Sequence, residues 1–107
     1  MATSTIAIAL YKPFPGQEDE LKKLVALHIP ALRKENLITE REPIQLTSSD
    51  GTIIEIFEWQ SSEASDKAHV LPSIQKIWVA MAEVAEFKTL SDLPESNKPF
   101  PNFLPIN

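Results

Sequence analysis

The chain has 107 residues, a net charge of −5 and no cysteine. This length fits one domain, and an apolar content of 43% with 23% charged residues is typical of a globular protein. The negative charge disfavours nucleic acid and anionic membranes as partners, and the lack of cysteine excludes disulfides, thiolate nucleophiles and cysteine metal sites. Residues 1–5 show neither the basic region nor the apolar run of a signal peptide or a membrane span, so we expect a soluble, cytoplasmic protein.

The first part of the chain predicts a strand followed by a long helix. Residues 5–11 are largely apolar at both sets of alternating positions, so we expect both faces of this strand to be covered. A helix is predicted over residues 17–34, with acidic residues in its first turn, basic residues in its last turn and an apolar stripe that includes His28. Pro30 is expected to kink this helix.

The middle of the chain predicts a β-hairpin. Residues 37–47 have strand character, and Pro43 marks an edge strand or a bulge. Residues 49–51, Ser-Asp-Gly, are a favoured turn sequence. The next strand, over residues 53–59, has the clearest pattern in the chain and is apolar on both faces.

Two helical stretches and a short strand follow. The helices are predicted over residues 63–71 and 73–86, separated by Pro72, and the strand over residues 87–90. The resulting order of elements is that of a ferredoxin-like α+β fold, an antiparallel sheet with two helices on one face. Because the strands are apolar on both faces, we expect the open face to meet a second copy of the chain in a homodimer.

Residues 91–107 form a Pro-rich tail beyond a core domain of residues 1–90. The tail cannot be helical, but it carries large apolar side chains: Leu93, Phe100, Phe103, Leu104 and Ile106. We expect an extended segment docked on its own subunit or on the partner, with a mobile tail as the alternative.

The two histidines are the candidate catalytic residues. His28 lies in the apolar stripe of the first helix and faces the sheet, either as a core histidine bonded to a backbone carbonyl beside Pro30 or as a base in a cavity wall. His69 lies about a quarter turn off the apolar stripe of its own helix, and is either exposed or a second base. With antiparallel helices, His28, His69 and Trp59 come to the same end of the sheet and can line one mouth.

A carboxylate and several aromatic residues are candidate substrate-binding groups. Glu55 lies in the middle of an interior strand, where a carboxylate is costly unless paired. It is a pocket group, an interface partner for a basic residue, or a sign of a different strand register. Phe57, Trp59 and Trp78 are expected to wall the same pocket, and Tyr11 is a weaker candidate. No HExxH, P-loop, GxGxxG or GxSxG motif occurs, so we predict no metal or other cofactor.

Two runs of residues resemble one known superfamily. Residues 58–64, Glu-Trp-Gln-Ser-Ser-Glu-Ala, followed by Ala68 and His69, resemble the strand-to-helix junction of the antibiotic biosynthesis monooxygenase superfamily. Residues 15–21, Pro-Gly-Gln-Glu-Asp-Glu-Leu, resemble the start of the first helix in that superfamily. The resemblance covers about residues 5–90. It implies a dimeric α+β barrel with a small cavity between helices and sheet in each subunit.

The resemblance also implies candidate functions. Similar members are cofactor-independent monooxygenases of small aromatic or quinol-like substrates, for which His28 or His69 would supply the base. Haem-degrading members have an asparagine on the first strand, which residues 6–10 lack, although a histidine is frequent in the superfamily at the position of His69. Two alternatives remain open: a non-enzymatic module that binds a small hydrophobic ligand, and a structural dimer without a working cavity.

Overall fold

A computed structural model describes residues 3–106 and contains a five-stranded antiparallel sheet with the strand order β4-β1-β3-β2-β5. The strands are β1 (Thr5–Pro13), β2 (Ile44–Thr47), β3 (Ile53–Trp59), β4 (Ala85–Lys88) and β5 (Leu104–Pro105). The long strands β1 and β3 pair at the centre of the sheet, with Ala9 opposite Glu55. Strands β1 to β4 have the order of a ferredoxin-like sheet, which confirms the predicted α+β fold.

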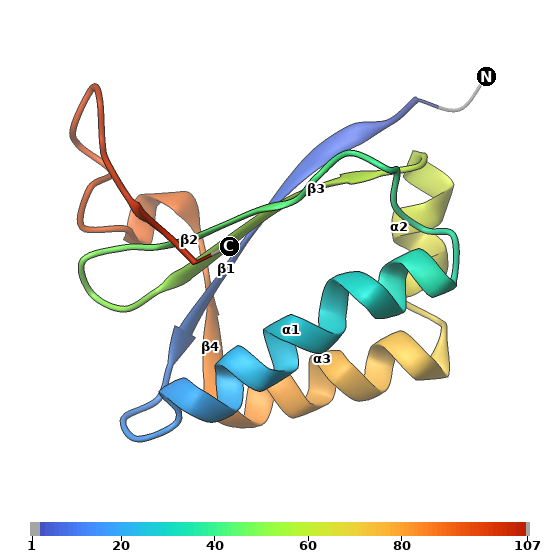
Figure 1. Cartoon of the computed structure of the whole chain (residues 1–107), viewed down its shortest axis with the longest axis horizontal. Helices are drawn as coiled ribbons and strands as arrows, with labels where there is room; N and C mark the ends of the chain where they lie inside the picture. The colour runs from blue at the N-terminus through green and yellow to red at the C-terminus, as the bar shows by residue number, and fades with distance from the viewer. Residues whose placement is uncertain (1–2, 107) are drawn as a thin grey trace.

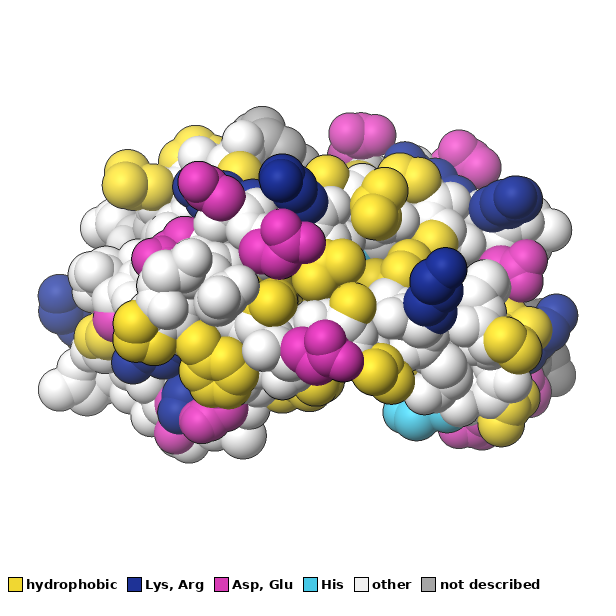
Figure 2. Space-filling model, turned by 90° about the horizontal axis from the view of Figure 1, so that it is seen from below, with side chains coloured by type: hydrophobic (Ala, Val, Ile, Leu, Met, Phe, Trp, Pro, Cys, Tyr) yellow, Lys and Arg dark blue, Asp and Glu magenta, His cyan; other side chains and the backbone are white. Residues whose placement is uncertain are grey.

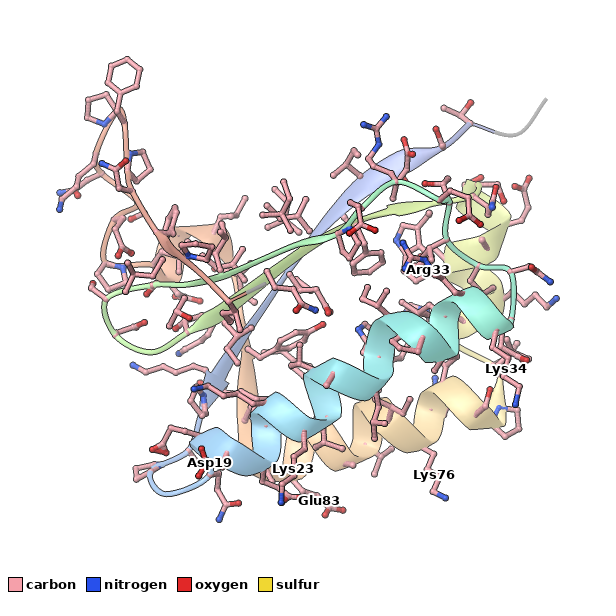
Figure 3. The ribbon with its side chains drawn as sticks, viewed as in Figure 1. Asp19, Lys23, Arg33, Lys34, Lys76 and Glu83 are labelled. Carbon is pink, nitrogen blue, oxygen red and sulfur yellow. The ribbon has the colours of Figure 1, made fainter. Side chains whose placement is uncertain are left out.

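Helices cover one face of this sheet. Helices α1 (Glu18–Lys34) and α3 (Pro72–Val84) run across it side by side, and the short α2 (Ser62–Ala68) lies at one end (Figure 1). Charged side chains of α1 and α3, among them Lys23, Lys76 and Glu83, point away from the sheet (Figure 3). The apolar sides of both helices are therefore left to pack against the strands.

Local signals in the sequence fix the helix ends. Acidic residues occupy the first turn of α1 and basic residues its last turn, matching the helix dipole. After α1, Asn36 adopts a left-handed conformation with φ of 57°, and the Leu37 N–H bonds to the Leu32 carbonyl at 3.0 Å. At the start of α2 the Ser61 hydroxyl accepts a hydrogen bond from the Ala64 N–H at 3.1 Å. These contacts satisfy backbone groups that the helices leave free.

The core has two parts, one on each face of the sheet. Between helices and sheet, two clusters of buried apolar residues run the length of the helices; their largest members are Tyr11, Leu21, Ile29, Leu32, Phe57, Trp59, Ile74 and Met81. On the helix-free face a smaller cluster joins Leu10, Ile54 and Leu93, with Phe103 packed against it. The tail thus supplies part of the core on that face.

Several element boundaries differ from the sequence predictions. Strand β2 is confined to Ile44–Thr47, because it begins after Pro43, and only an isolated bridge between Ile38 and Trp59 continues the pairing. Helix α3 begins on Pro72, since proline is well suited to the first turn of a helix. Strand β4 begins at Ala85, two residues before the predicted start, because Ala85 is already extended and pairs with Pro13.

The tail crosses the helix-free face and is anchored at two points. A 3₁₀ turn (Leu90–Asp92) leads to the buried Leu93, and β5 pairs with β2 (Figure 1). The Ile106 N–H also bonds to the Gln45 carbonyl at 2.8 Å. Phe100 and Leu104 are 87% and 73% exposed, so neither side chain docks on its own chain, and docking on a partner subunit stays a prediction. The segment between the anchors arches away from the sheet and carries Phe100 with it.

The helix-free side of β1 is only partly covered. Leu10 is buried beneath the tail, whereas Ile6 and Ile8 are 50% and 45% exposed. The expected cover on both faces of β1 is therefore incomplete within one chain. Among residues 3–106, no helix is both long and apolar enough to cross a lipid bilayer.

Candidate functional site

Glu55 is completely buried on β3 and accepts three hydrogen bonds. The Tyr11 hydroxyl donates to Oε1 at 2.9 Å, and His28 Nδ1 lies 2.7 Å from the same oxygen. The Gln45 amide donates to Oε2 at 2.8 Å. An isolated buried carboxylate would strongly destabilise the fold, so these donors explain how Glu55 is tolerated on an interior strand.

The hydrogen bonds around His28 define its tautomer. The Trp78 indole Nε1–H donates to His28 Nε2 at 2.9 Å. An indole N–H can only donate, so His28 Nε2 carries no proton and the imidazole proton lies on Nδ1. From Nδ1 it is donated to Glu55. The contacts therefore hold His28 between the Trp78 indole and the Glu55 carboxyl group, with both ring nitrogens engaged.

Tyr11 is held as a neutral donor. Burial, the charge of Glu55 and the hydrogen bond to that carboxylate together raise the pKa of the Tyr11 hydroxyl well above its ordinary value. Its ring also makes an edge contact with Phe87, with ring centroids 5.7 Å apart. Tyr11 therefore serves the site by donating to Glu55, and its phenolate is strongly disfavoured.

The sheet register explains why these groups meet. Gln45 on β2 lies directly opposite Glu55 on β3, and Ala9 on β1 lies opposite Glu55 on the other side. Tyr11, two residues beyond Ala9, shares its face of β1, while His28 comes from the buried side of α1. The small side chain of Ala9 leaves space beside the carboxylate for the larger groups.

A cavity of about 290 Å³ lies between the helices and the sheet. Strand β4 pairs only with the last four residues of β1. Ala7 and Ala9 precede this paired segment, so β4 does not cover the edge of β1 beside them. The lining residues come from strands β1, β3 and β4, from helices α1 and α3 and from the segment after α2. They are mostly apolar or aromatic: Ala7, Ile8, Ala9, Leu10, Tyr11, His28, Phe57, Trp59, His69, Trp78, Phe87 and Lys88. A cavity of this kind, apolar with a few polar groups, is typical of a small-molecule site.

His69 presents a different nitrogen environment from His28. Its Nδ1 lies 2.9 Å from the Ser65 carbonyl oxygen, which can only accept, so the proton of the neutral ring is on Nδ1. Nε2 then carries a lone pair, and no hydrogen bond to it is present within residues 3–106. The ring is exposed and packs edge-on against Trp78, with centroids 5.0 Å apart; a histidine is visible at the surface in Figure 2.

Six of the seven residues selected from the sequence line this one cavity. They are Tyr11, His28, Phe57, Trp59, His69 and Trp78. The seventh, Glu55, does not line the cavity, but it forms hydrogen bonds with Tyr11 and His28, which do. His28, Trp59 and His69 thus lie at one site, as the antiparallel helices suggested.

Sequence reasoning missed Gln45, Phe87 and Lys88. Gln45 lies between Ile44 and Leu46 in β2, and its position opposite Glu55 was the available signal, but that signal requires the strand register. Phe87 and Lys88 belong to β4, whose start was placed too late. Because β4 begins at Ala85, both residues pair beside the end of β1.

Comparisons with known proteins place the fold. No family model and no curated protein matches the chain. Among solved structures, that of Rv0793 from Mycobacterium tuberculosis is similar, with a TM-score of 0.68 and 20% sequence identity over 80% of this chain and 89% of that chain. At this identity the likeness shows a shared fold, in agreement with the ferredoxin-like order of the strands.

Proposed function

We propose that this protein is a cofactor-independent monooxygenase, as its resemblance to the antibiotic biosynthesis monooxygenase superfamily implies, and that a small aromatic or quinol-like substrate binds in the 290 Å³ cavity. The observation that carries this proposal is the lone pair on His69 Nε2 beside aromatic walls. His69 is the histidine whose second nitrogen makes no hydrogen bond in the described part of the chain, whereas both nitrogens of His28 are engaged.

In this proposal His69 Nε2 accepts the phenolic proton of the substrate. The resulting phenolate is electron-rich enough to reduce O₂ directly, without a bound redox group. One oxygen atom enters the ring carbon as a carbonyl, and the other leaves as water with the ring hydrogen and the phenolic hydrogen. A phenol and O₂ thus give a quinone and water, with the four electrons of the substrate reducing O₂ and no further reductant required.

The buried network acts as a positioning unit in this scheme. Trp78 contacts both histidines, donating its N–H to His28 and packing its ring against His69. Glu55 holds the proton of His28 on Nδ1, which keeps His28 Nε2 free to accept from Trp78. The network therefore fixes the indole plane that forms one wall beside the proposed base.

Oxygen uptake in the presence of phenols and quinols tests the proposal. A panel of hydroquinone, catechol and 1-naphthol should include at least one substrate whose O₂ consumption exceeds its spontaneous oxidation. His69→Asn retains a donor near the Ser65 carbonyl but removes the base, and we expect roughly a hundredfold loss of rate or more. The matched control Lys67→Gln, an exposed change in the last turn of α2 just before His69, should retain full activity. Full activity of folded His69→Asn protein would contradict the proposal.

His28→Gln separates the positioning role from the proton-accepting role. This variant should lower stability by about 1–3 kcal/mol, because the buried donor to Glu55 is lost, and should also lower the rate. The pH dependence of the remaining rate should stay that of the parent, since His69 is intact. A loss of that pH dependence in His28→Gln would instead make His28 the base.

The competing function is non-enzymatic binding of a small hydrophobic ligand in the same cavity. It shares the apolar lining but does not require the lone pair of His69. Titration of the panel compounds against tryptophan fluorescence distinguishes the two functions, because Trp59 and Trp78 both line the cavity. Saturable quenching that His69→Asn leaves unchanged, without enzymatic O₂ uptake by the parent protein, would favour the binding module.

The proposal includes a homodimer formed through the helix-free face. The support is three aliphatic side chains on that face, Ile6, Ile8 and Ile44, which are 50%, 45% and 51% exposed. Sedimentation should give a dimer at micromolar concentration, and Ile6→Lys combined with Ile44→Lys should shift it to a monomer. The matched control Val79→Lys, at a 57% exposed site on α3, should remain dimeric. A parent protein that sediments as a monomer would refute this arrangement.

A further inference from the structure

A second and larger cavity lies on the opposite face of the sheet, beneath the tail. Its volume is about 460 Å³. Leu93 anchors one end of the tail and the β5–β2 pairing anchors the other, and residues between these anchors form one wall of the cavity over β2 and β3. The cavity shares Ile8 with the site described above and is otherwise lined by different residues. It therefore requires a separate explanation.

The walls of this second cavity are mainly aliphatic. The sheet contributes Ile8, Leu46, Ile54 and Ile56, and the tail contributes Leu90, Leu93 and Phe103. Polar residues also line the cavity, all from the tail: Ser91, Glu95, Ser96 and Lys98. A flexible aliphatic chain suits such walls better than a flat polar ring, because contact with them removes apolar surface from water.

Glu95 is the unexplained group in this cavity. It is only 6% exposed, and its Oε2 accepts the Ser49 backbone N–H at 3.0 Å. Its Oε1 is also buried but has no hydrogen-bond partner among residues 3–106. The Ser49 N–H outweighs the effect of burial and lowers the pKa of Glu95, so the carboxyl is ionised at neutral pH. A buried carboxylate oxygen without a hydrogen-bond donor is destabilising, so a ligand that supplies a donor would be stabilised there.

We propose that the cavity beneath the tail binds a primary aliphatic amine, whose ammonium donates to Glu95 Oε1 while its chain lies against the aliphatic walls. A charged donor forms the stronger hydrogen bond with an ionised acceptor. The negative charge of Asp50 also acts on Glu95, which adds to the preference for a cation. Lys98 is exposed and forms no ion pair with Glu95 within residues 3–106, so its ammonium does not already fill this position.

Three probes with the same carbon chain test this assignment: hexylamine, 1-hexanol and hexanoate. Titration of the full chain, followed by the NMR signals of Leu93, Ile54 and Phe103, should show saturable binding of hexylamine. Binding of 1-hexanol should be weaker by roughly tenfold or more, and hexanoate should not bind. The Glu95→Gln variant keeps an acceptor for the Ser49 N–H and should lose hexylamine binding. The matched control Glu63→Gln, which removes an exposed carboxylate at the start of α2, should bind as the parent does.

Three results would overturn the proposal. Equal binding of hexylamine and 1-hexanol would mean that the charge of Glu95 has no role. Retained hexylamine binding in Glu95→Gln would place the amine elsewhere. Binding seen only in Lys98→Met would show that the ammonium of Lys98 is the natural donor to Glu95. None of these outcomes depends on the reaction proposed at His69, which lies on the other face of the sheet. The proposed dimer contact shares only Ile8 with this cavity, and Ile6 and Ile44 do not line it.

Discussion

The two faces of the sheet differ in the burial of their polar and apolar side chains. On the helix-covered face, a carboxylate is completely buried, and every polar side chain in contact with it has a hydrogen-bond role. On the helix-free face the side chains are mainly aliphatic, but Ile6, Ile8 and Ile44 remain about half exposed. The first face thus buries a carboxylate together with its hydrogen-bond donors. The second face exposes aliphatic side chains that the rest of the chain does not cover.

This difference follows from what lies above each face. Helices α1 and α3 span the first face and exclude water from Glu55, which makes each of its donors valuable. The tail crosses only part of the second face, over Leu10 and Ile54, and leaves an open cavity. The two-sided apolar pattern of β1 therefore has two outcomes: one side packs under the helices beside the buried Glu55, and the other side is only partly covered within one chain.

The largest effect is expected from breaking the sealed face. Glu55→Ala removes the acceptor shared by Tyr11, His28 and Gln45 and leaves a void on β3. We expect a loss of about 3–5 kcal/mol in the free energy of unfolding, measured by urea denaturation.

A carboxylate on the other face of the same strand is the control for that prediction. Glu58 accepts from Thr39 and Arg41 near the protein surface, so Glu58→Ala should leave the urea midpoint close to that of the parent. Glu55→Gln keeps one acceptor oxygen and should fall between the parent and Glu55→Ala. Equal effects of Glu55→Ala and Glu58→Ala would show that burial does not distinguish the two faces as described.

The order of the elements could be predicted because apolar residues repeat with a regular period in the strands and in the helices. Alternation identified β1 and β3, and the 3.6-residue stripe identified α1 with His28 on its inner side. The boundary between α3 and β4 was misplaced because residues 84–86 fit either pattern. There, pairing with Pro13 rather than local propensity decides the structure.

The helix-free face offers the second-largest effect, through the anchor of the tail. Leu93 is 8% exposed and packs on Leu10 and Ile54, so Leu93→Ala should cost about 2–3 kcal/mol in urea denaturation. Phe100→Ala, in the same tail but 87% exposed, should leave the unfolding free energy unchanged within error. An equal loss from both substitutions would mean that the whole tail docks, as the sequence alone suggested.

The candidate site was less predictable than the fold. Histidine and carboxylate were selected because polar groups at inward positions need partners. The identity of those partners could not be read from the sequence, since Gln45 meets Glu55 only through the register of β2 on β3. The exposure of Phe100 was also missed, because the composition of the tail does not show which of its residues contact the sheet and which project into solvent.

A smaller effect should appear on the sealed face at high pH. Tyr11 is the single tyrosine of the chain, and its pKa in the folded protein is raised well above the ordinary value, first by burial and then by Glu55. Above about pH 10 the unfolded tyrosine ionises while the folded one does not, so stability should fall by up to roughly 1.4 kcal/mol per pH unit. Tyr11→Phe should remove this part of the slope between pH 9 and 11. Identical slopes for parent and variant would argue against a buried, neutral Tyr11.

The smallest effect should occur on the helix-free face at low pH. The Ser49 N–H lowers the pKa of Glu95 in the folded chain, against the opposing effect of burial. A lowered pKa contributes stability above the unfolded value of about 4.3, and this contribution is lost as pH falls through the folded value. Because Glu95 ties the tail to the β2–β3 turn, acid should loosen the tail before it unfolds the sheet.

Amide hydrogen exchange compared at pH 6 and pH 3.5, corrected for intrinsic rates, should show protection falling at Ser49 while Ile54 and Phe57 remain protected. In Glu95→Gln, where no carboxyl titrates at this position, protection at Ser49 should not change over the same interval. If Ser49 and Phe57 lost protection together in the parent chain, the two faces would unfold as one unit in acid, and the tail would not be a separately anchored cover.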